Sequence, residues 1–108
     1  MQPACAPAFL FVETANVLLK YHRLTGMALT DVEVGLRQLR VIIRDVTDDD
    51  ILLSPAVRIA AANNHKVYDC LYLALAMQRR EPLTTADRRL AALARDLSIE
   101  TELIEPAL

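Results

Sequence analysis

The fold of this chain is decided by the stretch Tyr68-Asp69-Cys70-Leu71-Tyr72-Leu73-Ala74-Leu75-Ala76-Met77. Every residue in it except Asp69 is apolar or aromatic, which is typical of a buried helix. A carboxylate in such surroundings is costly unless a charged or hydrogen-bonding group meets it. Two more acids share this setting, because Glu13 interrupts an upstream apolar run and Asp87 follows a short β-compatible segment. We therefore take these three acids as candidate functional residues.

Length and composition predict one globular domain that spans residues 1–108. Hydrophobic residues make up 54% of the chain and charged residues 24%, as in ordinary folded domains. Glycine occurs twice while alanine and leucine abound, which favours helices over a β-sandwich or barrel. The formal net charge of −2 excludes a surface coated in positive potential, so any contact with nucleic acid must be local.

The cysteines and the apolar runs indicate the compartment. Cys5 and Cys70 are the two cysteines, too few for a disulfide framework, and favour a reducing, cytoplasmic setting. Glu13 and Asp69 break the longest apolar runs, so we expect no membrane-spanning helix. No lysine or arginine precedes Lys20, so the start lacks the basic region of a secretory signal.

Apolar periodicity predicts helices alternating with short strands. We expect helices at about 8–23, 30–43, 49–63, 68–80 and 87–97, and strands within 41–46, 83–85 and 99–104. Residues 1–8 suit an extended entry segment or a short edge strand. Pro55 leaves two alternatives for the third helix, which either begins near Asp49 and is kinked, or begins after a Ser54 cap. This alternation favours an α/β fold with a parallel sheet, in which ligands collect at the carboxyl ends of the strands.

Several local signals predict where the helices begin and end. Gly26 should end the first helix in the left-handed conformation, and Thr30 with Glu33 forms a capping box for the second. The acids of Asp48–Asp50 suit the N-terminus of the third helix. We expect His65, distant from the acids, to be a loop residue.

Each candidate acid also has a simpler interpretation when it is taken alone. Glu13 suits an exposed helix surface, Asp69 suits the first turn of a helix, and Asp87 suits an N-cap. If the three converge, carboxylates without a histidine or cysteine cluster suit Mg²⁺ or Mn²⁺. Such sites hydrolyse phosphodiesters.

Three segments together resemble the PIN domain, and more narrowly the ribonuclease toxins of VapBC-type toxin–antitoxin pairs. The segments are Glu13–Leu18, Val67–Ala76 and Leu83–Leu90. The resemblance implies a helix-rich, three-layer α/β fold, with a short parallel sheet flanked by helices.

The resemblance also implies roles for individual residues. Glu13, Asp69 and Asp87 match the acids that hold Mg²⁺ or Mn²⁺, and Thr85 matches a hydroxyl residue that supports the site. Such proteins are endoribonucleases that cut RNA, frequently a tRNA or rRNA. They are silenced by an antitoxin protein and commonly form homodimers.

Four arginines are candidates for contacts with RNA phosphates, although a solvated helix end explains them equally well. They are Arg79, Arg80, Arg88 and Arg89.

One part of the family pattern has no match in this chain. The family begins with a strand that ends in an aspartate, and nothing before Phe9 fits that description. Three explanations stay open: a truncated or mis-started form, a module completed by domain swapping or by a partner, and an inactive relative. The alternative function is accordingly a non-catalytic module that pairs with an antitoxin or with a second copy of itself.

Overall fold

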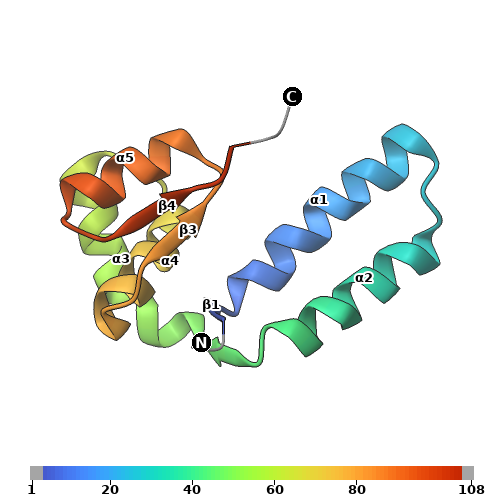
Figure 1. Ribbon diagram of the computed structural model, residues 1–108, viewed down its shortest axis with the longest axis horizontal. Coiled ribbons are helices and arrows are strands. Elements are labelled where there is room, and N and C mark those ends of the chain that lie inside the picture. The colour runs from blue at the N-terminus through green and yellow to red at the C-terminus, as the bar shows by residue number, and fades with distance from the viewer. Residues whose placement is uncertain (1–3, 106–108) are drawn as a thin grey trace. The chain divides into compact units, whose positions relative to one another are not determined.

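A computed structural model describes residues 4–105, and these form five helices and four strands (Figure 1). Their order is β1 (Cys5–Pro7), α1 (Phe9–Thr25), α2 (Leu29–Ile42), β2 (Asp45–Thr47), α3 (Asp49–Asn63), α4 (Val67–Arg79), β3 (Leu83–Thr85), α5 (Arg88–Asp96) and β4 (Thr101–Leu103). The helix-rich α/β class and the parallel strand pairing are confirmed. The chain divides into two compact units, with the boundary between Asp49 and Asp50.

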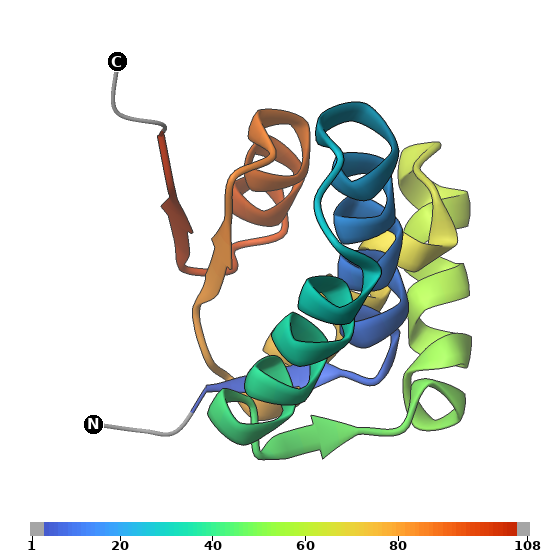
Figure 2. The same ribbon diagram turned by 90° about the vertical axis from the view of Figure 1, so that its right-hand side faces the viewer.

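The first unit combines a helical hairpin with a small sheet. Strands β1 and β2 pair in parallel, with Cys5 opposite Asp45, which confirms a short strand in the entry segment; residues 1–3 lie outside the described residues. Helices α1 and α2 run antiparallel beside each other (Figures 1 and 2). The guanidinium carbon of Arg40 lies 3.9 Å from the centre of the buried Phe11 ring, and this contact ties the two helices together.

The second unit is built around α4 and a second two-stranded sheet. Strands β3 and β4 pair in parallel, with Leu83 opposite Thr101, and α5, which connects them, contacts both strands. Helix α4 contacts β3 and is apolar on most of its surface. Its buried residues are Cys70, Leu71, Leu73, Ala74, Leu75 and Ala76. The apolar stretch Tyr68–Met77 therefore lies in the core helix of this unit.

Several helix boundaries differ in detail from the sequence predictions. Gly26 ends α1 with φ 78°, as expected. The prediction of a capping box at Thr30 is wrong, because α2 begins at Leu29 and its N-cap residue makes no side-chain cap bond. Helix α3 begins at Asp49 and contains Pro55, which excludes the Ser54 cap.

Among the acids Asp48–Asp50, Asp49 also caps a different helix, α1. Oδ1 of Asp49 accepts a hydrogen bond of 3.0 Å from the backbone N–H of Phe9, the first residue of α1. This bond satisfies one of the amides that a helix start leaves without a partner. No helix within residues 4–105 combines the length and the apolar composition needed to cross a bilayer.

Candidate active site

The first turn of α4 places Asp69 at the edge of the core. Asp69 is the third residue of the helix, where its negative charge complements the helix dipole. Its side chain is 20% exposed, and its Oδ2 accepts a hydrogen bond of 3.0 Å from Nε2 of His65. The Asp69 carboxylate thus has a hydrogen-bond donor and partial access to water, and both lower the cost of placing its charge at the edge of the core.

The turn between β3 and α5 holds Asp87 by three hydrogen bonds. Oδ1 of Asp87 accepts from the backbone N–H groups of Arg89 at 2.9 Å and Leu90 at 3.1 Å, which confirms Asp87 as the N-cap of α5. The backbone N–H of Asp87 donates to Oγ1 of Thr85 at 3.1 Å. Thr85 therefore fixes the backbone from which the carboxylate projects.

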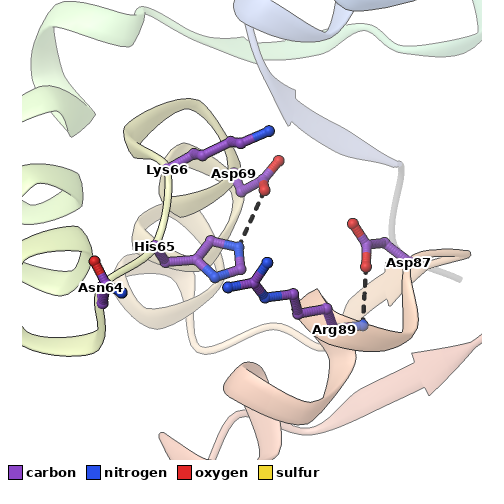
Figure 3. A pocket seen from close by; sticks show the side chains of 6 residues that line it. All are labelled: Asn64, His65, Lys66, Asp69, Asp87 and Arg89. Carbon is purple, nitrogen blue, oxygen red and sulfur yellow. Dashed lines mark hydrogen bonds and ion pairs between the residues drawn. The ribbon is translucent and has the colours of Figure 1, made fainter.

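Asp69 and Asp87 line the same pocket, of about 350 Å³. Its other lining residues are Asn64, His65, Lys66 and Arg89 (Figure 3). Figure 3 shows the Arg89 side chain extending from α5 toward His65. Acids that lie eighteen residues apart thus meet in one cavity, together with two cations.

The cations give this pocket a mixed electrostatic character. The pKa of Lys66 is raised, first by a hydrogen bond with the Tyr68 side chain and, to a smaller extent, by the charge of Asp69. Lys66 is therefore positively charged at neutral pH. Its Nζ lies 5.5 Å from the centre of the Tyr68 ring. Burial raises the pKa of the Cys70 thiol, with a further contribution from Asp69, so Cys70 is a neutral core residue.

The other predicted residues lie in several places. Glu13 is a partly exposed residue of α1, in the first unit, and its place at a metal site stays a prediction. Of the four arginines, Arg89 lines the pocket. Arg79 pairs with Glu81 at 3.9 Å and Arg88 with Glu105 at 3.5 Å, while Arg80 ends α4 in the left-handed conformation.

Three residues that line the pocket were not among the predicted site residues, namely Asn64, His65 and Lys66. His65 is a loop residue, as expected, but the statement that it is distant from the acids is wrong. It precedes Asp69 by four residues, a spacing at which side chains meet at a helix start. That spacing was the available signal.

Asp69 and Asp87 give the pocket two carboxylates, the type of ligand that hard divalent cations take. Mg²⁺ is commonly held by one or two carboxylates together with waters and substrate phosphates. Oδ1 of Asp69 and Oδ2 of Asp87 accept no hydrogen bond from the part of the chain that the structure describes. Within residues 4–105, no group of three or more His, Cys, Asp or Glu side chains suits a metal ion. The carboxylates among the residues that line the pocket are those of Asp69 and Asp87.

Comparisons with known proteins identify the family. The family model described as PIN domain matches residues 2–96. No curated protein matches the chain. The matched region includes Glu13, Asp69, Thr85 and Asp87. The chain therefore belongs to the PIN domain family, whose members are generally nucleases that use divalent metal ions.

Proposed function

We propose that this protein is an endoribonuclease of the VapC toxin type, which hydrolyses RNA phosphodiesters at a Mg²⁺ or Mn²⁺ site. The observation that carries the proposal is the pocket that Asp69 and Asp87 share with Lys66 and Arg89. Carboxylates suit the metal, and the adjacent cations suit a phosphate backbone. A pocket with both charges is what binding of a metal ion and a phosphodiester requires.

Each pocket residue has a role in this proposal. Asp69 and Asp87 would hold the ion, with Glu13 as a third acid, and Thr85 keeps Asp87 in place through its backbone. Such an ion lowers the pKa of a bound water and neutralises charge on the phosphate. Lys66 and Arg89 would bind phosphate oxygens and orient the RNA strand.

The finer parts of the proposal follow from the resemblance to VapC toxins. The substrate would be a tRNA or an rRNA, and the protein would act in the cytoplasm. A cognate antitoxin would silence it, and the active form would be a homodimer.

RNA cleavage by the purified protein tests the activity. We expect cleavage with Mn²⁺, loss of cleavage with EDTA, and loss again in Asp69→Asn, which keeps the shape of the side chain and removes its charge. Asp96→Asn is the matched control, because Asp96 is an exposed residue at the end of α5 and does not line the pocket. Cleavage that needs no metal, or that survives Asp69→Asn, contradicts the proposal.

Calorimetry with Mn²⁺ distinguishes the enzyme from the non-catalytic binding module. The enzyme should bind Mn²⁺, and Asp69→Asn should weaken the binding. A wild-type protein with no measurable Mn²⁺ binding at millimolar metal would instead favour the binding module.

A further inference from the structure

The side chain of His65 is more buried than the acid it contacts. It is 7% exposed, compared with 20% for Asp69, and Nε2 of His65 lies 3.0 Å from Oδ2 of Asp69. A deprotonated carboxylate accepts hydrogen bonds and donates none, so Nε2 is the donor. Both the Nε2–H tautomer and the imidazolium ring supply this proton.

The backbone fixes His65 from both sides. Asn64 ends α3 with φ 50°, and the backbone N–H of His65 donates to the carbonyl of Ala60 at 3.1 Å, the pattern of a Schellman motif. Lys66, the next residue, is the N-cap of α4. His65 therefore belongs to a rigid junction between two helices, with its ring directed at the first turn of α4 (Figure 3).

This placement restricts the carboxylate of Asp69. With Oδ2 held by His65, rotation about the last side-chain bond of Asp69 breaks the hydrogen bond. Oδ1, which accepts no hydrogen bond from the described residues, is then held in one orientation. Hydrogen bonds of this kind orient metal-binding carboxylates, and their loss typically weakens metal affinity by about 10- to 100-fold.

We infer that His65 is a positioning residue, which orients the Asp69 carboxylate for a divalent metal ion through the Nε2–Oδ2 hydrogen bond. The inference rests on the proposed function, since it assigns Asp69 to the metal. It adds a residue that neither the acids nor the resemblance to VapC toxins singled out. Its consequence is a metal affinity that depends on a side chain outside the set of carboxylates.

Mn²⁺ affinity, measured by calorimetry on the whole chain, tests this inference. We expect His65→Ala to weaken Mn²⁺ binding by about 10- to 100-fold. His65→Gln should restore most of the affinity, because its amide nitrogen can donate from near the position of Nε2. His22→Ala is the control, since the ring of His22 contacts the backbone of Met27 in the first unit.

Thermal unfolding in EDTA separates positioning from folding. If His65→Ala unfolds at a lower temperature, His65→Gln still decides the question, provided that it melts like the wild type. Wild-type affinity in His65→Ala, or in a stable His65→Gln an affinity as weak as in His65→Ala, overturns the inference and leaves the proposed function intact. A wild-type protein that binds no Mn²⁺ overturns both.

Discussion

Oδ1 of Asp87 lies 2.9 Å from the backbone nitrogen of Arg89, so the carboxylate that lines the pocket also caps α5. The same oxygen accepts a second bond from Leu90, and Oδ2 makes no hydrogen bond within the described residues. Oδ1 of Asp87 thus stabilises the start of α5, and Oδ2 is available to a ligand. Substitutions can separate these two roles.

Asp87→Asn should keep the N-cap of α5 and weaken metal binding. Asparagine caps helices about as well as aspartate, so the free energy of unfolding should change by less than about 0.5 kcal/mol. Mn²⁺ affinity should fall, because the ligand is no longer charged. Asp87→Ala should weaken Mn²⁺ binding and also remove the cap, which should lower the free energy of unfolding by about 1 kcal/mol. Urea denaturation and Mn²⁺ calorimetry measure the two effects, and equal Mn²⁺ affinity in Asp87→Asn and wild type would contradict a ligand role.

The two cations of the pocket should contribute to RNA binding. Lys66→Ala and Arg89→Ala should each weaken binding to single-stranded RNA and reduce the slope of log affinity against log salt by about 0.7, the value for one lost phosphate contact on a single strand. Fluorescence anisotropy in a salt series measures the slope. Arg95→Ala, an exposed arginine of α5 outside the pocket, should leave the slope unchanged. An equal effect in all three variants would mean that binding does not involve the pocket.

The sequence predicted the elements that have strong local signals. Pro82 and the turn residues around Asp87 bound a short, β-compatible segment, and β3 is Leu83–Thr85 as predicted. The apolar composition of α4 likewise predicted its burial. The separation of the strands into two sheets was not predicted, because strand pairing depends on contacts between distant segments.

The helix ends without glycine were predicted to within one residue, but the left-handed residues that follow them were not. Asn64, Arg80 and Ser98 have φ values of 50°, 52° and 61° and follow the ends of α3, α4 and α5. Arginine and serine seldom adopt this conformation, so their types gave no warning. After each of these residues, the next backbone N–H donates to a carbonyl in the last turns of the helix just ended (His65 to Ala60, Glu81 to Ala76, Ile99 to Ala94). The turn at Asn64 places His65 beside Asp69.

The residue types of the candidate site could be predicted from the sequence, but their arrangement in space could not. Asp69 and Asp87 each have an adequate local explanation as a helix-start acid, and only the folded unit brings them to one pocket. The four-residue spacing of His65 and Asp69 was visible, yet spacing alone does not distinguish a hydrogen bond from two solvated side chains.

Neighbouring leucines of α3 should differ sharply in their contribution to stability. Leu52 is fully buried, whereas Leu53 is 46% exposed. Leu52→Ala should lower the free energy of unfolding by about 3 kcal/mol, the range for a leucine that leaves a cavity, and Leu53→Ala by less than about 1 kcal/mol. Denaturation of both variants in urea measures the difference, and similar losses would contradict the burial of Leu52.

Glu13 is the predicted metal ligand that belongs to the first unit, and its role can be tested without assuming a geometry. If Glu13 completes the site with Asp69 and Asp87, Glu13→Gln should weaken Mn²⁺ binding by at least about tenfold, the smallest loss typical even of a supporting group. Glu33→Gln, on the exposed surface of α2, should not. Thermal unfolding in EDTA should be recorded for both variants, because a carboxylate that serves the fold alone would lower the melting temperature and leave Mn²⁺ affinity unchanged. That combination would remove Glu13 from the site and leave a metal centre of two carboxylates.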